Sequence, residues 1–104
     1  MPAHEELMAA AVAQTGLDDF GDGPFLEPLA RFLDSLNREA ELNDMGRLIA
    51  RERTLLHTVN RLEYVRDRHE HPTIAQERIV APVFIIGFPR TGTTILHDIL
   101  AQDP

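Results

Sequence analysis

The residues best suited to chemistry lie near the end of the chain, where Gly87 and Gly92 frame a short loop that contains Arg90. Glycine allows backbone angles barred to other residues and leaves no side chain to hold a ligand away. A run of apolar residues precedes the loop and helically spaced apolar residues follow it. The loop N–H groups should therefore converge at a positive helix N-terminus, where phosphate or sulfate binds and a cation does not.

The two glycines and the following Thr93 and Thr94 have the spacing of the phosphate-binding loop GxxxxGK[ST], with one difference. Thr93 stands at the lysine position, and the cation comes three residues earlier as Arg90. Transfer of a γ-phosphoryl group with Mg²⁺ needs a strong cation at that lysine position, so its loss weakens the case for ATP or GTP. A sulfuryl group carries less negative charge, so backbone donors, hydroxyls and one guanidinium suffice for its transfer, with no metal.

The segment F-P-R-T-G-T-T, residues 88–94, resembles the 5′-phosphosulfate-binding loop of the PAPS-dependent sulfotransferases, in particular that of the bacterial branch. The resemblance extends from about Pro82 to Pro104. It implies an enzyme that moves a sulfuryl group from 3′-phosphoadenylyl sulfate (PAPS) to a hydroxyl or amine acceptor of unknown identity. It also implies a catalytic role for Arg90, which would stabilise the leaving group. The implied donor-binding residues are Pro89, Arg90, Thr91, Gly92, Thr93 and Thr94.

The implied fold is α/β, with a P-loop-type parallel sheet preceded by an α-helical N-terminal region. Residues 1–78 form the helical region in this interpretation, and residues 79–104 begin the sulfotransferase domain with a strand at 83–86, the loop and a helix. A parallel sheet needs further strands and long crossovers. We therefore expect the chain to be an N-terminal piece of a larger protein. The residues for the 3′-phosphate and the acceptor's general base are then expected beyond residue 104.

The helical region should contain three helices. The first is expected from Glu5 to Gln14, with Gly16 ending it, and the second from about Leu26. The third should start after Asn43 as N-cap and continue to about Arg68. The second and third helices carry wide apolar stripes, which predict a buried hairpin of the two helices that could line an acceptor pocket. The stripe of the second helix comprises Phe25, Leu26, Leu29, Phe32, Leu33 and Leu36.

Composition limits the partners and the compartment. Residues 1–45 contain ten acidic residues against Arg31 and Arg38, which argues against nucleic acid. The chain has no Cys, which excludes disulfides and zinc–thiolate sites and favours the cytoplasm. No segment is apolar and long enough to span a membrane. The cluster at 69–71, with His57 upstream, lacks the i, i+4 spacing of helical zinc ligands and is expected to be an exposed helix end.

Two alternatives stay open. One is a nucleotide kinase or triphosphatase that uses the same loop. The other is a helical interaction module in which the glycine-rich turn is only a bend and Thr93 and Thr94 cap a helix. His97, three residues past Thr94, is either a structural residue of the last helix or a participant in the chemistry.

Overall fold

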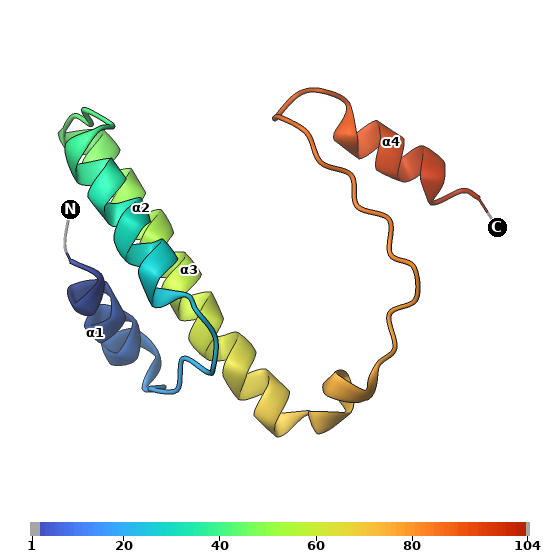
Figure 1. Cartoon of the computed structure of the whole chain (residues 1–104), viewed down its shortest axis with the longest axis horizontal. Helices are drawn as coiled ribbons and strands as arrows, with labels where there is room; N and C mark the ends of the chain where they lie inside the picture. Colours follow the sequence, from blue (N-terminus) through green and yellow to red (C-terminus); the bar gives the residue numbers. More distant parts are fainter. Residues whose placement is uncertain (1–2, 104) are drawn as a thin grey trace.

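The computed structural model describes residues 3–103, which form four α-helices and one 3-10 helix. The first three helices lie together, and the fourth lies apart from them at the end of an extended segment (Figure 1). We refer to this segment, residues 77–92, as the arm. The elements in chain order are α1 (His4–Thr15), α2 (Leu26–Arg38), α3 (Asp44–Glu70), η1 (Pro72–Gln76) and α4 (Thr93–Leu100).

The ends of α1 follow from local chemistry. Glu5 and Glu6 lie in its first turn, where negative charge is favourable to the helix dipole. Gly16 adopts a left-handed conformation with φ 72° and donates its N–H to the carbonyl of Val12. This is a glycine C-cap, so the prediction that Gly16 ends the first helix is confirmed.

The start of α3 is fixed by Asn43. Its side-chain oxygen accepts a hydrogen bond of 2.8 Å from the backbone N–H of Gly46, which satisfies one of the unpaired donors of the first turn. The helix continues for 27 residues and ends at Glu70, two residues before Pro72. The predicted N-cap is confirmed, and the predicted end near Arg68 is two residues early.

Replacing Asn43 with Ala is expected to lower the free energy of unfolding by about 1 kcal/mol, because the N–H of Gly46 loses its partner. Urea unfolding followed by circular dichroism at 222 nm measures this change. Asn60→Ala, on an exposed interior position of the same helix, is the matched control and should not be destabilising. Equal losses in the two variants would show that the cap contributes nothing specific.

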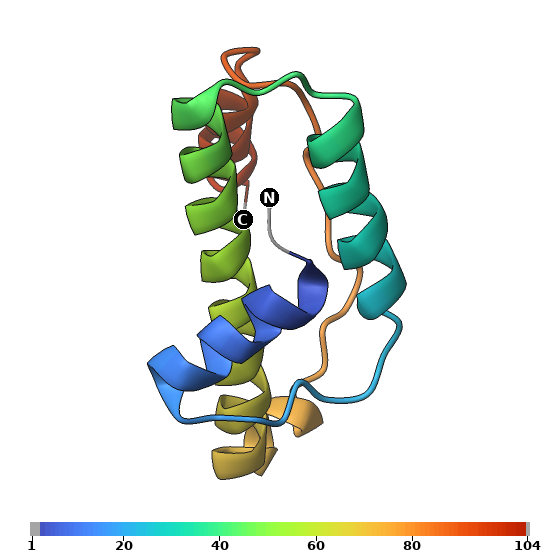
Figure 2. The ribbon, with the colours of Figure 1, turned by 90° about the vertical axis from the view of Figure 1, so that its left-hand side faces the viewer.

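The small core forms where α1 crosses α3 (Figure 2). Its buried members are Ala11, Val59 and Leu62, and Val12, Leu17, Phe20 and Leu55 pack around them.

The predicted buried hairpin of the second and third helices differs from the observed packing. The helices α2 and α3 lie antiparallel, but they make few direct close contacts, because α1 is the main packing partner of α3. Of the predicted stripe on α2 only Leu33 is buried, and Phe32 is 52% exposed.

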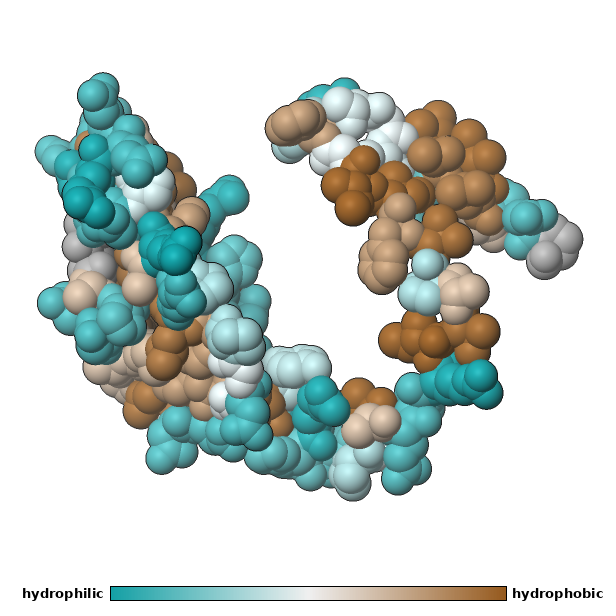
Figure 3. Space-filling model, in the orientation of Figure 1, coloured by the Kyte–Doolittle hydropathy of each residue, from teal (hydrophilic) through white to brown (hydrophobic). Residues whose placement is uncertain are grey.

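The predicted strand and parallel sheet are absent from residues 3–103, so this part of the fold prediction is not observed. Residues 82–88 are extended but pair with no other segment. The physical reason is that a strand is stabilised by hydrogen bonds to a neighbouring strand, and the rest of the described chain is helical or irregular. Val83, Phe84 and Ile86 are consequently 79–94% exposed, and brown apolar surface is visible on parts of the arm and of α4 in Figure 3.

The helix expected after the loop is present as α4, although its apolar residues Ile95, Leu96, Ile99 and Leu100 do not lie on a sheet and remain exposed. Within residues 3–103, none of the helices combines the length and the apolar character that crossing a membrane would need.

Candidate anion-binding loop

All six residues of the predicted donor site lie at the tip visible in Figure 1, four in the turn that ends the arm and two in the first turn of α4. The chain turns at Pro89 and Arg90, bends through Thr91 and Gly92, and enters the helix at Thr93. The structure therefore brings the sequence-predicted residues together over a single turn of backbone.

The backbone angles of the turn are unusual for the residues that adopt them. Arg90 has a φ of 67° and Gly92 has a φ of 91°, whereas the φ of Thr91 between them is not positive. Left-handed residues in a turn belong to the backbone pattern from which concave anion-binding nests are built. Gly92 adopts a positive φ without strain, whereas a positive φ at Arg90 costs conformational free energy because its Cβ crowds the backbone.

Gly87 is required by close packing within the loop. A Cβ atom at this position would lie 2.9 Å from Thr91 Oγ1 and 2.9 Å from Thr93 Cγ2. Contacts this short force a rearrangement, so any larger residue at this position would displace the side chains of Thr91 and Thr93. The sequence analysis placed Gly87 at the start of the loop, as one of its two framing glycines, but not among the donor-binding residues.

The Thr91 hydroxyl donates a 2.6 Å hydrogen bond to the carbonyl of Phe88 and so closes the turn. The first intrahelical bond of α4 runs from the N–H of Leu96 to the carbonyl of Gly92, at 3.1 Å. No side chain caps this helix, and the N–H groups of Thr93 and Thr94 have no acceptor among residues 3–103. The alternative in which these threonines cap α4 is not observed, and the first-turn donors are available to a ligand.

The cation of the loop is also available. Arg90 is exposed, and its guanidinium forms no ion pair with a carboxylate of residues 3–103. On α4, the Nδ1 atom of His97 lies 3.6 Å from an oxygen of its neighbour Asp98, and both side chains are more than 70% exposed. One guanidinium and several unpaired N–H groups are donors only, so the loop can hold an oxyanion.

The histidines of the helical region lie away from the loop. His69 and His71 are exposed at the end of α3, and Nδ1 of His69 is 3.8 Å from an oxygen of Asp19. Within the described part of the chain, no three His, Asp or Glu side chains gather as a metal site would require.

Comparison with known families singles out the same segment. Residues 82–104 match the sequence model of the sulfotransferase family. The resemblance to sulfotransferases is thereby confirmed over these residues, which contain the whole loop and α4. No curated protein and no solved structure is significantly similar to the chain.

Proposed function

We propose that this chain carries the donor-binding loop of a PAPS-dependent sulfotransferase. The observation that carries the proposal is the set of unpaired donors at the start of α4, assembled within the segment that matches the sulfotransferase family. The donor-binding residues are Pro89, Arg90, Thr91, Gly92, Thr93 and Thr94. Residues 79–104 are then the beginning of a P-loop-like domain, and residues 1–78 are a helical region that precedes it.

Each part of the loop has a distinct task in this proposal. The N–H groups of Gly92, Thr93 and Thr94 bind the 5′-phosphosulfate oxygens, and the two threonine hydroxyls add further hydrogen bonds. Arg90 offsets the negative charge that gathers on the departing phosphate, and it does so as an electrostatic and hydrogen-bonding partner, because guanidinium does not donate its proton at neutral pH. PAPS, when bound, supplies the sulfuryl group that an acceptor hydroxyl or amine takes up.

The proposal also covers the compartment, the acceptor and the metal requirement of the reaction. We place the protein in the cytoplasm and propose a small-molecule, glycan or lipid acceptor. We assign no metal to the loop. The loop composition supports the last point, since hydroxyls, N–H groups and one guanidinium neutralise a phosphosulfate without Mg²⁺.

The test of the proposal is a titration of the ¹⁵N-labelled chain, followed by amide shifts, with adenosine 3′,5′-bisphosphate and, separately, with Mg-ATP. Saturable shifts are expected at residues 91–95, with tighter binding of the bisphosphate. The Arg90→Ala variant should bind the bisphosphate about tenfold more weakly, because one charge-assisted hydrogen bond is lost.

The control for Arg90→Ala is Arg78→Ala, which removes the same charge from an exposed position before the loop. It should leave binding unchanged. Tighter binding of Mg-ATP than of the bisphosphate would favour a nucleotide kinase or triphosphatase. A folded Arg90→Ala variant with full anion affinity would favour the interaction module, in which the turn is only a bend.

A further inference from the structure

An apolar groove lies between α2 and α3 and shares no residue with the loop. It comprises two adjoining cavities of about 280 and 460 Å³, both lined in part by Phe32, Thr54 and His57. The lining residues of α3 extend from Gly46 to Arg61. At 1.5 Å per residue, this stretch of helix gives the groove a length of roughly 22 Å. We refer to it as the α2–α3 groove.

The walls and the floor of the groove are largely apolar. On the side of α2 it is lined by Phe25, Leu29 and Phe32. On the side of α3, Thr54 and Thr58 are 4% and 5% exposed, and their hydroxyls donate to carbonyls of the same helix, at 2.7 and 2.8 Å. Neither hydroxyl proton is therefore free for a polar ligand. Aromatic and aliphatic walls around a few hundred cubic ångströms are typical of small-molecule sites.

The charged side chains that line the groove are all basic. Arg53, His57 and Arg61 follow one another at intervals of four residues along α3, and none of the lining residues found within 3–103 is acidic. The whole chain has 17 acidic residues against ten basic ones, so composition does not explain this pattern. On α2, Glu27 and Asp34 form ion pairs with arginines of their own helix. The groove therefore favours an anionic ligand.

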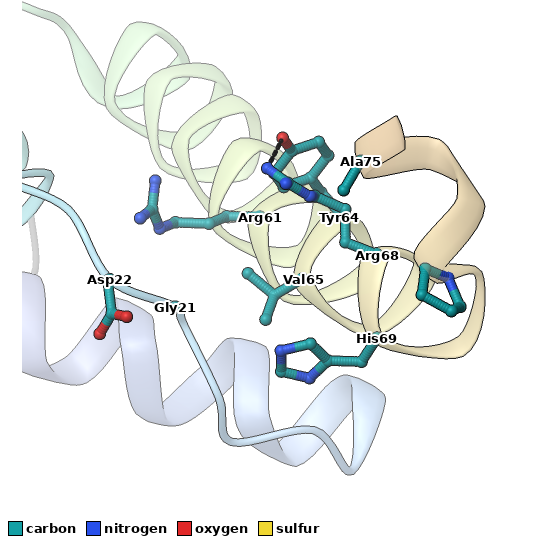
Figure 4. A pocket seen from close by; sticks show the side chains of 9 residues that line it. Gly21, Asp22, Arg61, Tyr64, Val65, Arg68, His69 and Ala75 are labelled. Carbon is teal, nitrogen blue, oxygen red and sulfur yellow. Dashed lines mark hydrogen bonds between the residues drawn. The ribbon is translucent and has the colours of Figure 1, made fainter. Parts of the chain in front are cut away.

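Arg61 lies at one end of the groove and is held there by the linker between α1 and α2. Figure 4 shows its side chain extending from α3 away from Tyr64 and Arg68. Its Nε–H donates a 2.7 Å hydrogen bond to the carbonyl of Phe20, and its guanidinium carbon lies 4.0 Å from the centroid of the Phe25 ring. It forms no ion pair with a carboxylate of residues 3–103. The guanidinium is thus ordered beside a wall of the groove, and its charge is uncompensated.

The size of the groove fits a slender ligand better than a protein helix. A helix with its side chains is about 10–12 Å across, so two turns of one fill roughly 900 Å³. The two cavities together provide less than this volume. A flexible alkyl chain follows a long, narrow groove and removes its own apolar surface, and that of the walls, from water.

We propose that the α2–α3 groove binds a long-chain alkyl carboxylate, with its carboxylate on Arg61 and its alkyl chain passing Phe32 toward Ile49. The carboxylate accepts charge-assisted hydrogen bonds from the guanidinium. The alkyl chain covers side chains that are now in contact with water, since Phe32 is 52% and Ile49 is 49% exposed. The proposal does not rest on the proposed sulfotransferase function, because the groove and the loop share no residue.

The probe is decanoate, added to the ¹⁵N-labelled full chain below the concentration at which it forms micelles. Saturable amide shifts are expected at residues 29–32 and 54–61. Decanol, which has an alkyl chain of the same length but no charge, should bind at these residues about tenfold more weakly, because the charge-assisted contact is lost.

Two variants separate the carboxylate contact from the apolar wall. Arg61→Gln should lower the affinity for decanoate about tenfold and leave that for decanol unchanged, whereas Phe32→Ala should weaken the binding of both ligands. Since Arg61 also bonds to Phe20, the affinity for decanol reports whether the groove stays intact in this variant. Arg68→Gln and Leu56→Ala are the matched controls, because they change exposed residues of α3 outside the groove, and both affinities should stay unchanged.

Equal affinities for decanoate and decanol, or equal weakening of both ligands by Arg61→Gln, would overturn the proposal. Shifts that grow without saturation, or that are as large at the exposed apolar residues 83–86 of the arm, would also overturn it, because they describe general coating of apolar surface. Shifts of the groove amides with protein concentration alone, together with a dimer in sedimentation velocity, would assign the groove to a second copy of the chain instead.

Discussion

Gly87→Ala is expected to lower the affinity of the loop for adenosine 3′,5′-bisphosphate by about a hundredfold, the effect of losing two charge-assisted hydrogen bonds. The added Cβ would lie 2.9 Å from both Thr91 Oγ1 and Thr93 Cγ2, so these two side chains must shift to accommodate it. We expect this shift to distort the loop and to displace the N–H groups of Thr93 and Thr94. Dissociation constants from amide shifts of residues 91–95 measure the change.

Gly16→Ala is the matched control. Gly16 also has a positive φ, of 72°, but no atom lies within 4 Å of the position that its Cβ would take. This variant should destabilise the end of α1 by about 1 kcal/mol and leave ligand affinity unchanged. Bisphosphate binding by Gly87→Ala at the affinity of the unmodified chain would show that loop closure is irrelevant to the ligand.

Leu62→Ala is expected to lower the free energy of unfolding of the helical region by about 2–5 kcal/mol. Leu62 is fully buried between α1 and α3, with Ala11 and Val59, and its truncation leaves a void that the few surrounding side chains cannot fill. Urea unfolding followed by circular dichroism measures the loss. So small a core makes this among the largest single stability effects expected in the chain.

Leu56→Ala provides the comparison on the same helix, because Leu56 is 55% exposed. It should cost less than about 1 kcal/mol, since little apolar surface leaves contact with protein. Similar losses for Leu56→Ala and Leu62→Ala would contradict the packing of α1 on α3.

The helix boundaries could be predicted because each depends on a few neighbouring residues. Asn43 caps α3 by a bond to Gly46, three residues away, and Gly16 ends α1 by a bond to Val12. Packing could not be predicted in the same way. The apolar stripe of α2 indicates burial but not its partner, and the weakly amphipathic α1 took the position on α3 that the pattern assigned to α2.

In the candidate site, too, the features that depend on neighbouring residues could be predicted, and the feature that depends on a distant segment could not. The spacing from Gly87 to Thr94 predicted a turn followed by a helix, and both are present because glycine conformation and helix initiation are local. The strand before the loop was predicted from its β-branched residues, but pairing depends on a second strand, which residues 3–103 do not contain.

The extended residues 83–87 leave their main-chain N–H and C=O groups without partners among residues 3–103, and their apolar side chains face water. Such a segment is a template for any other extended chain that meets it. Two copies of this protein at high concentration can therefore align these segments and grow an intermolecular β-sheet, whereas the acidic helical region keeps its neighbours apart by charge repulsion. Precipitation of the chain would accordingly begin at this segment.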